Sequence, residues 1–210
     1  MPLDNEVTKE MGKKVLIATL FNPEPVLLAS TKLGPERIIL LVSKDMTKEQ
    51  EASIKLIQGS LGKVIDIKVV KIEVYDIVEI ARKCVEIIDM QPDEDEIYIN
   101  ITSGRKTQAI GLLFSAYARH EKVKKIAYYP EEDKNSIIYL PRLSFKLTEG
   151  QKKILEQIEN KKYSSIGDLA PKVDLSNAML YRAIAELKDM DLISTEDGIT
   201  LTDAGKIARL

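Results

Sequence analysis

The sequence contains little cysteine and little histidine, and each scarcity excludes a class of site. Its one cysteine, Cys84, excludes a disulfide within the chain and fits a reducing, intracellular compartment. Because Cys84 lies in a helical pattern, we expect a buried apolar side chain rather than a reactive thiol. Its one histidine, His120, excludes a metal site built from several histidines and gives no support to a serine-type catalytic triad.

A charge excess and long apolar runs are also lacking. The 31 basic and 33 acidic residues give a formal net charge of -2, so any patch that binds nucleic acid is local. No apolar run approaches the ~20 residues that cross a bilayer, so we expect no membrane contact. Residues 1–13 are polar and lack the apolar core of a signal peptide. We expect a flexible arm there and a cytoplasmic protein.

Strand and helix patterns alternate between residues 14 and 140. Short apolar runs such as 14–19 are typical of buried parallel strands, and the three- and four-residue spacing at 77–88 is typical of a helix. The alternation predicts an α/β, Rossmann-like, mostly parallel sheet over 14–140, with a linker at 141–147. Strands are predicted at 14–19, 37–42, 64–70, 97–101, 124–129 and 137–140, and helices at 26–33, 47 to about 60, 77–88 and 105–119.

Residues 148–210 carry three helix patterns followed by a hairpin. A capping box at Thr148 and Gln151, a start signal at Ser165 and another at Ser176 open the helices. A turn at Asp197-Gly198 predicts the hairpin. This order resembles α+β winged helix-turn-helix domains, in which the third helix enters the major groove of double-stranded DNA. The resemblance implies these DNA-binding residues on that helix: Asn177, Ala178, Tyr181, Arg182 and Lys188.

The charge of this segment leaves a second interpretation open. Residues 148–210 hold nine basic and eleven acidic residues, and the wing tip at 195–198 has no cation. DNA affinity depends largely on neutralising phosphates. A winged helix that docks on protein or dimerises therefore remains an alternative to one that binds DNA.

The segment Asn100–Lys106 lies where a predicted buried strand turns into a helix. Gly104 allows a ligand to approach the backbone, and the free N–H groups of a helix start favour an anion. Ligands of open parallel sheets bind at the carboxyl ends of strands. The segment matches neither a P-loop nor a dinucleotide fingerprint. The residues alone therefore leave two options open, a phosphate site and an ordinary helix start.

This turn after the fourth strand, with a winged helix behind it, resembles CARF-domain proteins over roughly residues 13–210. The chain looks most like CRISPR-associated transcriptional regulators of the archaeal CARF–winged-helix type. In that family a Rossmann-like domain dimerises, and the dimer groove binds a cyclic oligoadenylate, usually the tetra-adenylate ring. The family turn often has glycine where this chain has Ser103. The resemblance places the ligand-binding residues at Thr19, Leu20, Phe21 and Asn22 after the first strand, and at Thr102, Ser103, Gly104, Arg105 and Lys106.

The resemblance implies a homodimer that binds promoter DNA in antiviral defence, senses cyclic oligoadenylate, and uses neither cofactor nor metal. It implies no enzymatic activity, although some CARF domains slowly cleave their ring. In such a ring nuclease Lys106, Arg105 and Ser103 would serve, but these motifs contain no histidine or carboxylate to act as general base. A docking protein whose winged helix binds protein is the other alternative.

Overall fold

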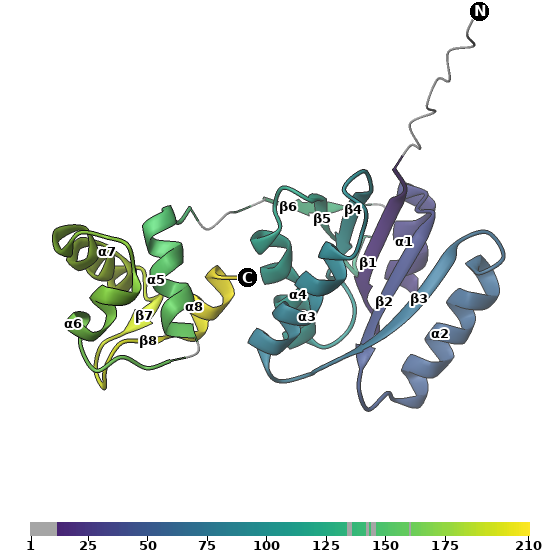
Figure 1. The fold of residues 1–210 in the computed structure, drawn as a ribbon. Helices are drawn as coiled ribbons and strands as arrows, with labels where there is room; N and C mark the ends of the chain where they lie inside the picture. Colours follow the sequence, from purple (N-terminus) through teal and green to yellow (C-terminus); the bar gives the residue numbers. More distant parts are fainter. Residues whose placement is uncertain (1–11, 134–135, 142, 144–145, 160) are drawn as a thin grey trace, which may run out of the picture.

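A computed structural model of the chain describes residues 12–133, 136–141, 143, 146–159 and 161–210. It contains a large unit built on a six-stranded sheet and a smaller, mainly helical unit with a two-stranded sheet (Figure 1). The predicted arm at 1–13 lies outside the described residues except for Gly12 and Lys13. The predicted linker at 141–147 is described only at Pro141, Leu143, Lys146 and Leu147.

The large sheet has the order β3-β2-β1-β4-β5-β6. Its first five strands are parallel, and β6 runs antiparallel to β5. The prediction of a mostly parallel, Rossmann-like sheet is confirmed. The strands are β1 Lys14–Thr19, β2 Arg37–Ser43, β3 Asp66–Ile72, β4 Glu96–Asn100, β5 Val123–Tyr128 and β6 Ile138–Leu140.

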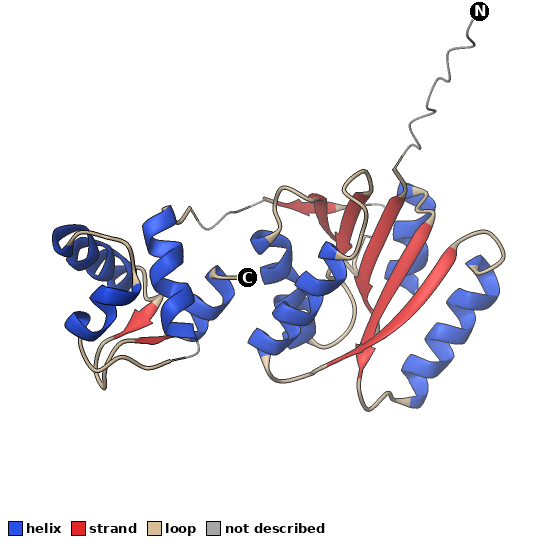
Figure 2. Cartoon of the chain, viewed as in Figure 1, coloured by secondary structure: helices blue, strands red, loops and turns tan. Residues whose placement is uncertain are grey.

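Helices cover both faces of this sheet (Figure 2). Successive side chains of a strand point to opposite faces, so Val15 and Ile17 pack with α3 and α4, whereas Leu16 and Ala18 pack with α1 and α2. Both faces of β1 are therefore buried under helices, which explains its uninterrupted apolar run. The helices are α1 Glu24–Leu33, α2 Lys48–Leu61, α3 Ile77–Asp89 and α4 Lys106–Ala118.

Three predicted boundaries are wrong by two residues, and one of them is the end of the third strand, which lies at Ile72 rather than at residue 70. The third strand begins at Asp66 rather than at residue 64, because the N–H groups of Val64 and Ile65 donate to the Leu61 carbonyl and close a turn after α2. The first helix begins at Glu24 rather than at residue 26. Proline fits the first helical turn, where no N–H partner is needed, so Pro25 does not delay the start.

The smaller unit has the predicted order of three helices and a hairpin. The capping box at Thr148 and Gln151 opens its first helix, and Ser165 and Ser176 cap the next two. Gly198 has a φ of +97°, as the predicted turn needs. The elements are α5 Glu149–Glu159, α6 Ile166–Leu169, a short 3-10 helix Ala170–Lys172, α7 Asn177–Asp189, β7 Ile193–Ser194, β8 Thr200–Leu201 and α8 Asp203–Ala208.

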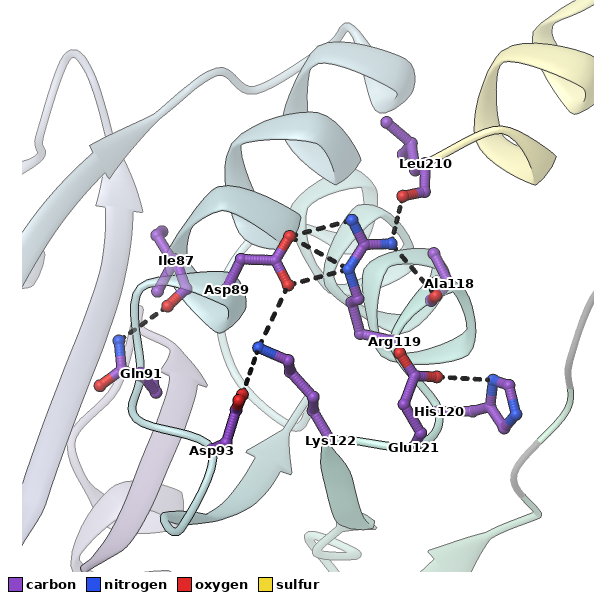
Figure 3. A network of polar contacts seen from close by, with 10 residues as sticks. All are labelled: Ile87, Asp89, Gln91, Asp93, Ala118, Arg119, His120, Glu121, Lys122 and Leu210. Carbon is purple, nitrogen blue, oxygen red and sulfur yellow. Dashed lines mark hydrogen bonds and ion pairs between the residues drawn. The ribbon is translucent and has the colours of Figure 1, made fainter. Parts of the chain in front are cut away.

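The two units meet where α8 packs against α3 and α4. Arg119, directly after α4, lies between Asp89 at the end of α3 and Leu210 after α8 (Figure 3). Its guanidinium contacts both carboxylate oxygens of Asp89 at 2.8–3.1 Å and donates to the carbonyl oxygen of Leu210. Lys122 lies 3.8 Å from Asp89 and 3.0 Å from Asp93. The C-terminal ends of three helices, α3, α4 and α8, thus meet at the junction.

Candidate functional site

A cavity of about 420 Å³ opens at the carboxyl ends of β1, β4 and β5. The chain passes from β1 to β2 on one side of β1, whereas β4 lies on the other side. The helices that follow β1 and β4, which are α1 and α4, therefore cover opposite faces of the sheet. Ligands of open α/β sheets bind at such a switch point. The cavity is lined by Phe21, Asn22, Glu24, Pro25, Leu28, Thr102, Ser103, Gly104, Tyr129, Pro130 and Glu131.

Ser103 joins the two loops that the sequence predicts for the site. Its Oγ accepts from the backbone N–H groups of Phe21 and Asn22, both at 2.9 Å, and donates to the Asn22 carbonyl at 3.3 Å. A serine hydroxyl has one donor and two acceptor positions, so all of them are in use. The Thr19 hydroxyl donates to the Ser103 carbonyl from below. Ser103 therefore holds the turn together instead of presenting a free hydroxyl.

Gly104 is required by its neighbours within the fold. It has a φ of +87°, and a Cβ at this position would lie 2.8 Å from the Cβ of Thr19. The expectation from sequence is that this glycine makes room for a ligand. A side chain at this position would meet Thr19, so packing within the fold requires a glycine here, and Gly104 also lines the cavity.

Asn100 organises the same edge of the sheet, and sequence reasoning missed its role. Its Oδ1 accepts from the N–H of Thr102 at 3.0 Å and from the Thr102 hydroxyl at 2.6 Å, while its Nδ2 donates to the Pro25 carbonyl at 3.0 Å. The Thr102 hydroxyl in turn accepts from the N–H of Tyr129 at 2.9 Å. An asparagine that ends an apolar strand, buried at 1% exposure, is the signal that could have identified it.

Thr19 and Leu20 lie beneath the cavity and are not part of its lining. Both are buried, and Leu20 is bound through its backbone to Leu41 and to the side chain of Gln50, each at 2.9 Å. Phe21 and Asn22 line the cavity, and Phe21 is 41% exposed. The predicted loop thus divides into two supporting residues and two lining residues.

Arg105 and Lys106 stand outside the cavity lining, at the exposed start of α4. Arg105 is the N-cap residue of α4 and makes no side-chain cap, so it supplies no acceptor to the N–H groups of the first turn, where the positive end of the helix dipole lies. Thr107 and Gln108 tie this turn to the loop after β3 by donating to the carbonyls of Val74 and Glu73. Cations and helix dipole together suit an anion beside the cavity.

Within the described part of the chain, the charged residues that line the cavity are the carboxylates Glu24 and Glu131. Sequence reasoning missed both, because neither lies in the two predicted motifs. Glu131 is brought to the site by the end of β5, and no local pattern announces it. The two predicted motifs contain no carboxylate, whereas the cavity that they help to line contains two.

Other titratable groups have structural explanations. Cys84 is buried in the core as predicted, and burial raises the pKa of its thiol to about 12. Burial also raises the pKa of Tyr129 to about 12, so its phenol stays neutral. His120 is exposed beside Glu121, 3.2 Å from its carboxylate and away from the cavity. Among the residues described, no group of histidine, cysteine and carboxylate side chains is arranged to hold a metal ion.

The five residues predicted to bind DNA, namely Asn177, Ala178, Tyr181, Arg182 and Lys188, are all exposed on α7. Arg182 donates from Nε to Glu186 at 2.9 Å, and Glu186 also accepts from Gln151 at 2.9 Å. Met179, which sequence reasoning did not single out, is as exposed as Tyr181, at 59%. No helix within the described ranges is long and apolar enough to span a membrane.

Comparison with known proteins identifies similarity to one family and to several solved structures. A family model described as "HFX_2341_N:-like, N-terminal" matches residues 15–135. A search of curated proteins finds no match. Can2 from Sulfobacillus thermosulfidooxidans, solved in complex with cyclic tetra-adenylate, has 16% identity and a TM-score of 0.50 over 92% of this chain and 62% of its own. Protein VC1899 from Vibrio cholerae has 13% identity and a TM-score of 0.50 over 93% of this chain and 64% of its own.

A type III CRISPR defence DNA nuclease activated by cyclic oligoadenylate has 13% identity and a TM-score of 0.48, over 84% of this chain and 30% of its own. The chain thus spans less than two thirds of the length of each of these three structures. At these identities the similarity to Can2 and to VC1899 establishes the fold of the chain.

Proposed function

Because this chain belongs to the family described as "HFX_2341_N:-like, N-terminal", and because its fold is that of the cyclic tetra-adenylate complex of Can2, we propose that it senses a cyclic oligoadenylate. The α/β unit is the CARF-type ligand-binding domain of this proposal, and the unit at 148–210 is its winged helix-turn-helix. The sensor regulates transcription in a CRISPR system. The observation that carries the proposal is the cavity at the sheet switch point, flanked by Arg105 and Lys106 at the start of α4.

The phosphates of the ring are placed outside the cavity, at the first turn of α4. There the helix dipole, two cationic side chains and the N–H groups of the first turn act together on an anion. Phe21 and Asn22 line the cavity beside them. Calorimetry with cyclic tri-, tetra- and hexa-adenylate tests this placement, and we expect one ring size to bind.

A double variant and a matched control make that test specific. Arg105→Ala with Lys106→Ala is expected to abolish ring binding or weaken it at least about tenfold, because two charge-assisted contacts are lost. Arg182→Ala with Lys188→Ala removes the same two residue types from exposed positions on α7 and should leave ring binding unchanged. Equal affinities of the two double variants would refute the phosphate site.

We infer a homodimer, because a cyclic tetranucleotide can itself have two-fold symmetry. A two-fold groove presents the same turn twice, to opposite phosphates of one ring. Light scattering with and without the ring measures the mass, and a stoichiometry of one ring for two chains is expected. A monomer that binds one ring would contradict this part of the proposal.

For the smaller unit we propose DNA binding through α7. Its support is the order of helices and hairpin behind a capped, solvent-facing α7 that carries Asn177 and Arg182. A gel shift with the promoter of the chain's own gene cluster tests it at low salt, with and without ring. The Arg182→Ala with Lys188→Ala variant should lose the gel shift. The Arg105→Ala with Lys106→Ala variant should keep the gel shift that is seen without ligand.

Helix α4 supplies a path from the ligand to this unit. Its first turn follows Gly104, and its end leads to Arg119, which holds Leu210. The glycine at position 111 packs so closely on α3 that a Cβ there would lie 2.4 Å from Ile80. The two helices are therefore tightly packed, and we infer that a ligand that shifts the turn also biases the junction.

Two alternative functions each have one supporting observation. The carboxylates Glu24 and Glu131 beside the turn favour a ring nuclease, although the Ser103 hydroxyl is already in use. Incubation with cyclic tetra-adenylate followed by chromatography tests that activity. The exposed Met179 and Tyr181 favour a winged helix that docks on protein, which a pull-down with CRISPR effector complexes tests.

A further inference from the structure

The charged side chains inside the cavity differ in sign from those beside it. In the lining, as far as the structure describes it, the charged side chains are Glu24 and Glu131, and the cations Arg105 and Lys106 stand outside. Two like charges about 4 Å apart repel by roughly 1 kcal/mol in water and by more in a partly closed cavity. A phosphate is therefore disfavoured within the cavity and favoured just outside it.

The rest of the lining suits a flat group with apolar faces. Phe21, Pro25, Leu28, Tyr129 and Pro130 form apolar walls, and the half-exposed Phe21 ring offers a face for stacking. Nucleobases that are not paired in a helix are recognised in this way, stacked on aromatic rings and hydrogen-bonded along their edges. The cavity volume of about 420 Å³ lies within the usual range for small-ligand sites.

Glu131 is held in place by the same network that builds the turn. The Thr102 hydroxyl accepts from the N–H of Tyr129, which fixes the end of β5, and Pro130 restricts the backbone before Glu131. Glu131 thereby lies in the lining of the same cavity as Phe21, although the two residues come from different loops. An ionised carboxylate only accepts hydrogen bonds, so its natural partner is an amine donor.

We propose that this cavity is the base subsite of the ring, in which Phe21 stacks on an adenine and Glu131 accepts from its exocyclic amine. The proposal rests on the proposed ligand class and adds a determinant of base specificity. Adenine carries an amino donor at position 6, whereas hypoxanthine carries an oxygen acceptor there. Glu131 consequently attracts the first base and repels the second.

The test compares cyclic tetra-adenylate with its inosine counterpart, which has the same ring and phosphates, by calorimetry on the full chain. The wild type is expected to bind the adenine ring at least about tenfold more tightly, because a charge-assisted bond is replaced by a repulsion. Glu131→Gln should bring the two affinities within about threefold of each other and tighten inosine binding in absolute terms, since an amide can donate to an oxygen. A damaged fold cannot produce that gain.

Glu132→Gln is the matched control, because Glu132 is the adjacent exposed carboxylate and does not line the cavity. It should retain the wild-type preference. Phe21→Ala should weaken both rings to a similar extent, because stacking depends little on the identity of the base.

The outcomes separate this inference from the function on which it rests. If the wild type binds both rings equally, the base subsite is overturned and ring sensing stands. If Glu131→Gln and Glu132→Gln behave alike, the role of Glu131 is overturned. If the wild type binds neither ring, the base subsite and the proposed ligand class both fail.

Discussion

Replacing Arg119 by alanine isolates the junction between the two units. The guanidinium forms a two-pronged ion pair with Asp89, within the larger unit, and one hydrogen bond to Leu210, which follows α8 of the smaller unit. Only the second contact crosses the junction. Arg119→Ala thus weakens the attachment of α8 and leaves the ligand cavity untouched.

The expected magnitude follows from the exposure of the groups. A hydrogen bond to a charged group contributes about 1.5–3 kcal/mol. The Arg119 side chain is 23% exposed, so solvent screening reduces the contribution of its contact with Leu210 to about 1 kcal/mol. That free energy corresponds to a change of about fivefold in the ratio of docked to undocked units.

The assay measures the coupling between ligand and DNA. DNA affinity is determined by fluorescence anisotropy with and without cyclic tetra-adenylate, and the ratio of the two affinities is the coupling factor. Arg119→Ala is expected to reduce this factor by up to about fivefold, with ring affinity in the absence of DNA unchanged. Small-angle scattering of the variant should show a larger radius of gyration.

Lys122→Ala is the control for this variant. Lys122 lies near Asp89 and Asp93, yet no contact of it reaches Leu210 within the described part of the chain. It removes one cation from the same network without touching α8. Equal coupling factors for the wild type and Arg119→Ala, or equal losses for Arg119→Ala and Lys122→Ala, would refute the argument that this contact transmits the signal.

Three further predictions concern the stability of the α/β unit. Gly104→Ala should lower the free energy of unfolding in urea by about 2–4 kcal/mol, because of its positive φ and the contact with Thr19. Gly59→Ala, which has open space around it in α2, should raise that free energy by about 0.5–1 kcal/mol. Similar changes for the two variants would contradict the packing argument. Ser103→Ala should cost about 1–2 kcal/mol, because two backbone N–H groups lose their acceptor, and a loss within error of zero by the same titration would show that water replaces it fully. Burial raises the pKa of the Cys84 thiol from an ordinary 9.0 to about 12. As pH rises, the thiol of the unfolded chain therefore loses its proton before the thiol of the folded chain does. The free energy of unfolding should consequently fall as pH rises from about 9 toward 12. Cys84→Ala should show a shallower fall, and a thiol reagent should react with the wild type only after denaturant is added.

Much of the fold could be predicted because its signals are local. The apolar run of β1, the three- and four-residue spacing of α3 and the capping box at Thr47 and Gln50 each depend on neighbours within a few positions. The errors at the starts of β3 and α1 arose where local rules compete, at the turn after α2 and at Pro23 and Pro25.

The site was predictable only in part, because its contacts join distant segments. Ser103 contacts Asn22 across 81 positions, and Thr102 contacts Tyr129 across 27. Nothing in either segment alone shows that the serine hydroxyl is consumed by the other loop. Glu131 enters the cavity by the same long-range route, so no motif contained it.

The ion pair between Arg182 and Glu186 decides how α7 can meet DNA. The pair is exposed, with side-chain exposures of 83% and 44%, so releasing Arg182 costs at most about 1 kcal/mol. A bidentate contact from arginine to guanine contributes about 1–3 kcal/mol of discrimination. Base reading is therefore favoured over the intrahelical pair. Phosphate neutralisation contributes less to the proposed DNA affinity, since the segment 148–210 carries more carboxylates than cations. In the proposed homodimer, two such units raise each other's effective concentration at adjacent half-sites, and we propose that the ring acts by setting their spacing.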